Sequence, residues 1–437
     1  MLRVAHKVGV FGTVIAGKIP LGLGLKFEKS LLPFSPVARL HHTNGLDADP
    51  VAIQMIKYAL GLARSQKSDD SYAQSFLVLE QCLSSAKVRE EGGENSEGTQ
   101  GTVLLAMSTL LYERGDINEA VEKLQGILGP SKSSLSLQVV AMEALIGLSL
   151  EIGQDVTSLL VAERCTELVK TSLGDGGVDN SEIDILHHQA KSIRGLAELV
   201  NGNTEKGQMF YDNSLEDTSS TGNALLNQAE FLHATGNLAS AKDLYMKSIQ
   251  RMQKSEEIVD HSGLSACNMI PIEGLLGATC ALGQLEAHSG NFQDAEETLT
   301  KALTEAEKHF GSHHPKVGVI LTCIALMFRH KAMMERSSSI LIQEGLYRKA
   351  IELLKAPSLE AEDEASKVDR RDMVALARGG YAEILTVQQN RKEEGQRMKS
   401  WAEHAWTNRR LSLAEVLDIS ENSTKVAVVD TRISRVL

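Results

Sequence analysis

Apolar residues recur along this chain with the period of about 3.6 residues that is typical of amphipathic helices, starting near Pro50. The clearest unit spans residues 221–251. Its apolar and small positions fall on one face of each of two helical runs: Leu225, Ala229 and Leu232, then Ala241, Tyr245 and Ser248. The pair Gly236-Asn237 between the runs predicts a tight turn, so the unit is expected to be a helical hairpin.

A glycine followed five residues later by an alanine recurs between helical runs, at Gly115, Gly236, Gly290 and Gly345. We interpret each glycine as the turn of a hairpin and each alanine as the small residue where its two helices cross. Further hairpins are expected at 54–86, 101–128, 135–172, 188–216, 276–308 and 367–408. In the first of these, Gly61 is placed at the small site of the first helix and Ala73 at the crossing. The pattern predicts an all-α solenoid of about seven or eight hairpins over residues 50–410.

The order of side-chain sizes within these hairpins resembles that of the tetratricopeptide repeat. In 221–251 a large apolar residue comes early in the first helix, a small one in its middle, and alanine and an aromatic residue follow on the second. The segment Glu305–Phe328 (EAEKHFGSHHPKVGVILTCIALMF) joins two helical runs through a His-Pro loop and resembles the longer repeats of the kinesin-light-chain type. The next hairpin departs from that pattern, because the insertion MMERSSSILIQE displaces its second run.

This resemblance implies a right-handed α-α superhelix whose concave surface is lined by the first helix of each hairpin. Such grooves bind a protein partner as an extended peptide or a helix. We expect the partner contacts on the inner wall formed by 222–330 to include Asn223, Asn227, Glu230, Gln284, His288 and Arg329.

The first 45 residues differ in charge from the rest of the chain. They carry six basic side chains and one acid, whereas the whole chain has a formal net charge of −12. On a helix, apolar residues of this segment form one stripe: Val4, Val8, Phe11, Ile15 and Ile19. A basic amphipathic N-terminal helix resembles a mitochondrial presequence. We therefore expect the protein in the mitochondrial matrix or at the inner membrane, with chloroplast and cytoplasm as alternatives, and leave cleavage open.

Charge and cysteine content limit the classes of partner and the compartments that are expected. Lys18, Pro20 and Lys26 interrupt the N-terminal segment well short of the roughly 20 apolar residues of a membrane span, so an integral membrane protein is not expected. The acidic body repels phosphate backbones, which disfavours nucleic acid as a partner. The five cysteines are scattered and odd in number, which favours buried free thiols in a reducing compartment.

The sequence contains no recognisable set of catalytic residues. Gly12–Lys18 has the GxxxxGK spacing of a phosphate-binding loop, but position 19 is Ile, so the hydroxyl that would bind Mg²⁺ is missing. The adjacent pairs His41-His42, His187-His188 and His313-His314 point about 100° apart on a helix, which is unsuited to one metal. We expect no enzyme activity, no cofactor and no metal.

These features predict a protein–protein interaction scaffold, an assembly or accessory factor of a mitochondrial complex. The alternatives are an organellar RNA-associated or regulatory factor and a cytosolic adaptor similar to kinesin light chains. The sequence leaves the partner and the oligomeric state open. It also leaves open the role of the tail, residues 411–437, whose end (NSTKVAVVDTRISRVL) alternates Val and Ile with polar residues. That end could be a short strand, a docking segment or disorder.

Overall fold

The fold is almost entirely helical. The computed structural model describes residues 48–88, 96–129, 133–172, 180–211, 220–254, 265–359, 369–418 and 425–437. The segment 1–45, which the sequence predicts to be a targeting signal, lies outside these residues.

The α-helices, in chain order, are α2 (Pro50–Gln66), α3 (Asp69–Val88), α4 (Ser96–Arg114), α5 (Ile117–Ile127), α6 (Leu135–Glu151), α7 (Asp155–Ser172), α8 (Asn180–Val200), α9 (Thr204–Gln208), α10 (Gly222–Ala234), α11 (Leu238–Lys254), α12 (Pro271–His288), α13 (Phe292–Phe310), α14 (Pro315–Met334), α15 (Ile340–Leu353), α16 (Arg371–Val387), α17 (Lys392–Ala405) and α18 (Leu413–Leu417). Short 3-10 helices are η5 (Cys267–Met269) and η7 (Gln389–Arg391), and the two strands are β1 (Val429–Asp430) and β2 (Arg435–Val436).

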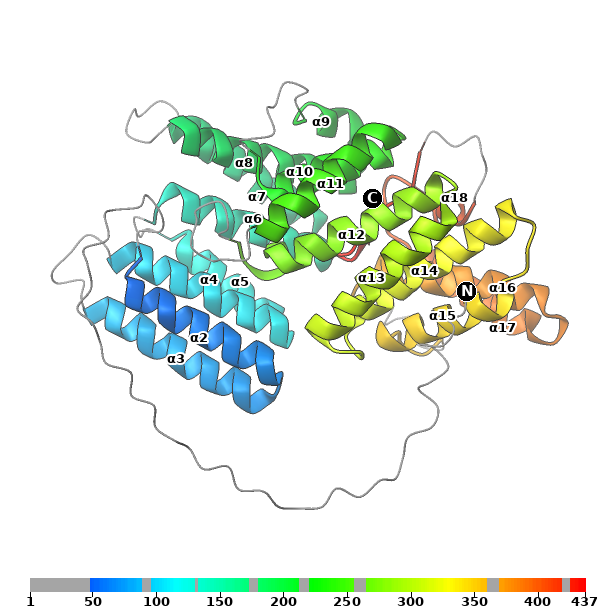
Figure 1. The fold of residues 1–437 in the computed structure, drawn as a ribbon, viewed down its shortest axis with the longest axis horizontal. Coiled ribbons are helices and arrows are strands. Elements are labelled where there is room, and N and C mark those ends of the chain that lie inside the picture. Colours follow the sequence, from blue (N-terminus) through cyan, green and yellow to red (C-terminus); the bar gives the residue numbers. More distant parts are fainter. Residues whose placement is uncertain are drawn as a thin grey trace, which may run out of the picture.

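Consecutive helices pack in pairs, from α2 with α3 to α16 with α17, and the pairs stack on one another in chain order (Figure 1). The even-numbered helices also contact each other in sequence, α2 to α4 and onward to α16, so they form one continuous wall. This arrangement confirms the predicted all-α helical solenoid. The described residues form eight such pairs, which agrees with the expected seven or eight.

The turn glycines are mostly where the sequence places them. Gly115, Gly236 and Gly290 adopt φ values of 99°, 84° and 78°, a left-handed conformation that glycine reaches without a steric penalty. Gly345 was wrongly assigned as a turn, because it lies inside α15. The insertion lengthens both helices of that pair, and the chain turns instead between Met334 and Ile340.

Close helix crossings account for other glycines. A Cβ atom added to Gly380 on α16 would lie 2.4 Å from the ring of Tyr347 on α15, so any other residue here would have to displace that ring. The crossing proposed in the first pair is wrong: a Cβ at Gly61 would meet nothing within 4 Å, and Ala73 is exposed. The small buried residues there are Ser71 and Ser75, because α3 is rotated relative to the expected register.

One helix, α14, is long and apolar enough by composition to cross a membrane. Within the fold, 61% of its apolar window is buried against other helices. It packs between α12, α13, α15 and α16. These neighbours explain its apolar character as that of a core helix.

The crossing at Gly380 generates a stability prediction. Gly380→Ala should lower the free energy of unfolding by about 1–3 kcal/mol, because the added methyl group must displace the fully buried Tyr347 ring. The matched control is Gly61→Ala, which should raise stability by up to about 1 kcal/mol through helix propensity alone. Urea unfolding followed by circular dichroism measures both. Equal effects of the two substitutions would contradict the close crossing.

Candidate interaction groove

The C-terminal segment 425–437 lies inside the solenoid, against the wall of even-numbered helices (Figure 1). It folds into a hairpin in which Val429 pairs with Val436 and Asp430 with Arg435. The Leu437 amide donates to the Val428 carbonyl at 2.7 Å. Every residue from Val428 to Leu437 is buried, so this segment fills the groove where the sequence predicts a partner.

The alternating apolar residues of the segment face two parts of the core. Val428, Ile433 and Leu437 join a cluster with side chains of α6, α7, α8 and α10. Val429 and Val436 join the large cluster formed by helices from α12 to α18. The alternation seen in the sequence is therefore that of a short hairpin buried on both faces.

Arg432 is the central charge of the groove. Its guanidinium, which is fully buried, donates to the Glu230 carboxylate of α10 at 2.6 Å and to Asp430 at 2.9 Å. Burial lowers the pKa of Arg432, but Asp430 and Glu230 more than offset this, so its net pKa is raised. Burial and the nearby Asp430 raise the pKa of Glu230, and Arg432 acts in the opposite direction. The three groups form one buried ionic unit.

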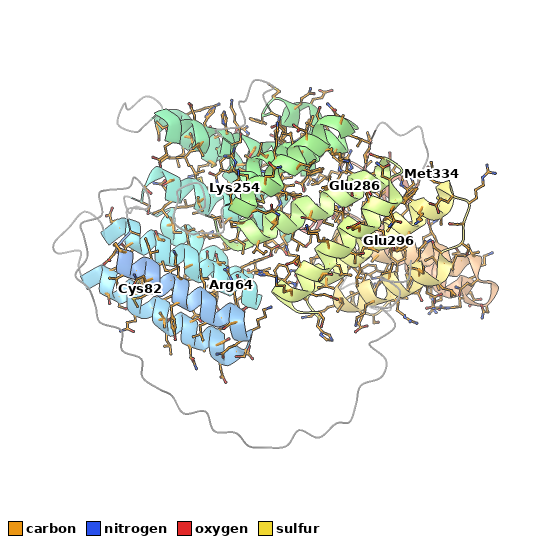
Figure 2. The ribbon with its side chains drawn as sticks, viewed as in Figure 1. Arg64, Cys82, Lys254, Glu286, Glu296 and Met334 are labelled. Atoms are coloured by element: carbon orange, nitrogen blue, oxygen red, sulfur yellow. The ribbon has the colours of Figure 1, made fainter. Side chains whose placement is uncertain are left out.

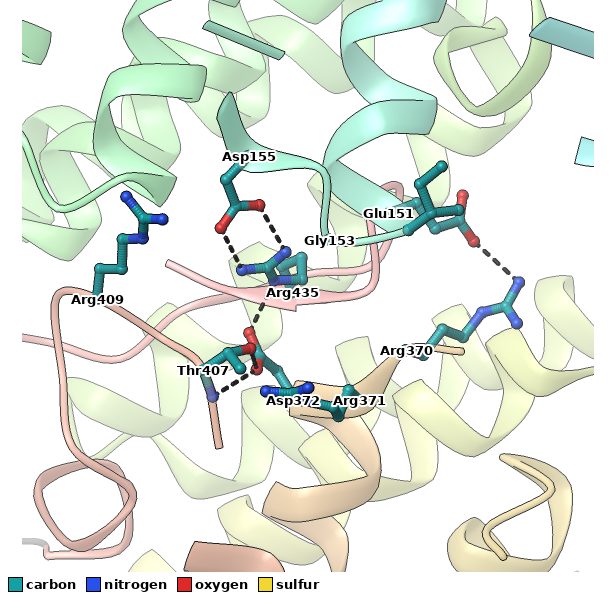
Figure 3. A pocket seen from close by; sticks show the side chains of 10 residues that line it. Glu151, Gly153, Asp155, Arg370, Arg371, Asp372, Thr407, Arg409 and Arg435 are labelled. Carbon is teal, nitrogen blue, oxygen red and sulfur yellow. Dashed lines mark hydrogen bonds and ion pairs between the residues drawn. The ribbon is translucent and has the colours of Figure 1, made fainter. Parts of the chain in front are cut away.

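Arg435 makes a second ionic contact, three residues further on. Its guanidinium donates to Asp155 at 3.0 Å and to Asp372 at 2.7 Å, which lie in the first turns of α7 and α16 (Figure 3). It also donates to the Leu150 carbonyl at 3.0 Å. Arg435 thus bridges two helical pairs that are far apart in the sequence.

Groove side chains also bind the backbone of the segment. The Gln284 amide donates to the Val429 carbonyl at 2.9 Å and accepts from the Val429 amide at 2.8 Å, as a neighbouring strand would. The Lys316 ammonium group, fully buried, donates to the carbonyls of Thr431 at 2.9 Å and Arg432 at 2.6 Å. Arg410, in the loop after α17, donates to the carbonyls of Val426 and Leu437.

The wall beneath the segment holds further buried acids. Burial raises the pKa of Glu143 to about 7, although Gln189 donates to it at 2.5 Å and Arg432 lies nearby. Burial also raises the pKa of Glu273 to about 7, and its ion pair with Lys316 at 3.2 Å opposes that effect. These acids make the groove suited to cationic side chains.

The structure divides the six predicted contact residues into two groups. Asn223 and Glu230 lie under the segment and accept from Arg432, at 3.4 and 2.6 Å. Asn227 is fully buried beneath them and donates to Ser192. Gln284, His288 and Arg329 line an open cavity beside the segment. Their role as contacts to a partner stays a prediction.

That cavity has a volume of about 610 Å³ and borders the first residues of the segment. Its walls combine apolar side chains with a few polar ones: Leu238, Leu326, Met327, Met334, Val426 and Ala427 with His288, Arg329, His330, Glu415 and Lys425. At its rim, Met334 ends α14 and is half exposed (Figure 2). A second cavity of about 380 Å³ borders Arg435 and is lined mainly by charged residues (Figure 3).

Sequence reasoning missed the residues that hold the segment: Asp155, Lys316, Asp372, Arg410, Arg432 and Arg435. The alternation in the tail was a signal that it could be a strand. Its ionic partners carried no such signal, because Arg432 pairs with a residue 202 positions away and Arg435 with one 280 positions away.

Comparison with known families agrees with this geometry. A tetratricopeptide repeat model matches residues 275–316, which run from within α12 through α13 to the first residues of α14. No curated protein matches the chain. Among the described residues, no group of three or more His, Cys, Asp or Glu side chains is placed to hold a metal ion.

The ionic unit around Arg432 generates the second prediction. Arg432→Met should lower stability by about 3–5 kcal/mol, because Glu230 and Asp430 remain buried without their cation. Adding Glu230→Gln should recover part of the loss by removing one of the two anions. Arg397→Ala, at an exposed position of α17, is the control and should change stability by less than about 0.5 kcal/mol. Urea unfolding of the four proteins tests this. An Arg432→Met protein as stable as the parent would contradict the pairing.

Proposed function

Because this chain is a tetratricopeptide-repeat-like helical solenoid, and so in general a protein–protein interaction scaffold, we propose that it is an assembly or accessory factor of a mitochondrial complex. Repeats of this type place many side chains along one extended surface, which suits recognition of another chain. The partner is a protein segment, either an extended peptide or a helix.

The open cavity beside the C-terminal segment carries this proposal. Its volume of about 610 Å³ is large enough to accept several side chains of a partner. The apolar residues Leu326, Val426 and Ala427 supply burial, whereas His288 and Arg329 add polar groups to the lining. Three of the six residues expected from the sequence to contact a partner therefore line one concave site.

Exposed apolar residues at the end of α14 and the start of α15, of which Met334 lines the cavity, extend the proposed surface. Met333 and Met334 end α14, and Leu341, the most exposed of the group at 83%, follows at the start of α15. Methionine is common on surfaces that adapt to a partner, because its side chain is flexible and polarisable. A partner segment that leaves the cavity along α14 would cover these side chains.

The net charge of the chain supports a protein partner over RNA. The whole chain has a formal net charge of −12. An acidic protein repels phosphate backbones, which bind to basic strips instead. The mitochondrial location rests on the basic, amphipathic composition of residues 1–45.

A single charge in the cavity tests the proposal. Leu326→Glu should abolish capture of the partner, because a carboxylate would be buried against the partner's apolar side chains. The matched control is Leu160→Glu on α7, a leucine that is 62% exposed and lies away from the cavity. Tagged parent and variant proteins are expressed in cells, and proximity labelling followed by mass spectrometry identifies their neighbours.

We expect the parent and Leu160→Glu proteins to label the same set of mitochondrial proteins and Leu326→Glu to lose the members of one complex. Thermal unfolding of each purified protein shows that the variants are folded. An identical set of neighbours for all three proteins would exclude the cavity as the docking site. A set that contains only cytosolic proteins would overturn the mitochondrial assignment.

A further inference from the structure

The groove surface that residues 425–437 occupy, which we call the seat, has the features of a peptide-binding site. The segment touches side chains from helical pairs between α6 and α16, but those pairs also contact one another directly. The ionic contacts come from Glu230 on α10, Asp155 on α7 and Asp372 on α16, and Gln284 on α12 pairs with the backbone. The wall is thus built by the repeats, and the segment occupies it.

We propose that this seat binds, in trans, an extended segment of a partner protein that carries two arginines three positions apart, in exchange for residues 425–437. This proposal rests on the proposed function and names the kind of segment that the scaffold recognises. The arginine spacing follows from the two acidic contacts, with Glu230 at one arginine and Asp155 with Asp372 at the other. Pairing through Gln284 favours an extended backbone before the first arginine.

The segment is an imperfect occupant of this seat, which makes exchange feasible. Thr431 and Ser434, at the turn of the hairpin, each bury a hydroxyl oxygen that has no hydrogen-bond partner in the protein. A buried hydroxyl without a partner weakens binding, because it loses its hydrogen bonds to water. Ser434 also adopts a φ of 53°, a left-handed conformation that is unfavourable for any residue with a Cβ.

The groove also contains polar atoms that the segment leaves without hydrogen-bond partners. Glu230 binds Arg432 through one oxygen, and its other carboxylate oxygen is buried without a partner in the protein. The side-chain oxygen of Asn268, on η5 at the floor of the groove, is in the same state. A partner segment with the same two arginines and better-matched residues at the turn would therefore bind more tightly than the chain's own segment.

Peptide exchange on the folded protein tests the proposal. A protease site introduced within residues 419–424 allows the full chain to be folded first and cut afterwards. A fluorescent peptide with the sequence of 425–437 is then added, and fluorescence anisotropy follows its binding. We expect saturable binding of one peptide per protein, with release of the severed segment detected by mass spectrometry.

Variant peptides test the recognition chemistry. Replacing both Arg432→Gln and Arg435→Gln should weaken binding by at least about 100-fold, because the groove acids would lose their cations. Ser434→Gly should bind about 3-fold more tightly, because glycine adopts the left-handed turn without strain.

Three results would overturn the proposal. The cut protein could unfold, which would make the segment a fixed part of the core. The severed segment could stay bound with no exchange over days. The double-glutamine peptide could bind as well as the parent peptide, which would exclude recognition of the arginines. None of these results depends on partner capture at Leu326, so the two proposals can fail separately.

Discussion

The structure depends on the neutralisation of acids that the solenoid buries on its inner wall. Glu230, Asp155 and Asp372 come from three different helical pairs and lie where water is excluded. Burying a carboxylate without a cation costs several kcal/mol, so these pairs can close around the groove only if positive charge is supplied. Arg432 and Arg435 supply it from the end of the same chain. The short C-terminal hairpin therefore joins repeats that sequence separates by more than 200 residues.

This arrangement changes how a repeat scaffold of this type can work. An empty groove would offer its whole concave wall to a partner, whereas here the central part is filled and the accessible part is the cavity beside Val426 and Ala427. Two modes of recognition follow from the same geometry. A partner segment can add to the edge of the filled groove, or it can replace the hairpin when it brings equivalent arginines. When the hairpin is replaced, the specificity comes from a few polar groups, Gln284 and the acids, set among apolar side chains.

Local pattern was sufficient to predict most of the fold. Periodicity and turn glycines located nearly every helical pair, because these signals act over a few residues. They failed at Gly345, where the same Gly-to-Ala spacing lies within α15, and at Ala73, where helix rotation depends on packing. Gln284, His288 and Arg329 could be placed on the inner wall because inner-wall positions follow from helical phase, and their role as contacts to a partner stays a prediction. The occupant of the groove could not be found, because pairing of Arg435 with Asp155 is a long-range event that leaves no local trace.

In the folded protein in solution, residues 425–437 should be a folded part of the groove. Hydrogen–deuterium exchange with mass spectrometry measures this directly on the unmodified protein. The amides of Val428, Val429, Arg432 and Leu437 donate within the protein, so the C-terminal peptide should be protected for hours, like peptides from α6 and α12. Exchange of that peptide within seconds, as in an unstructured chain, would contradict the central claim and leave the groove open.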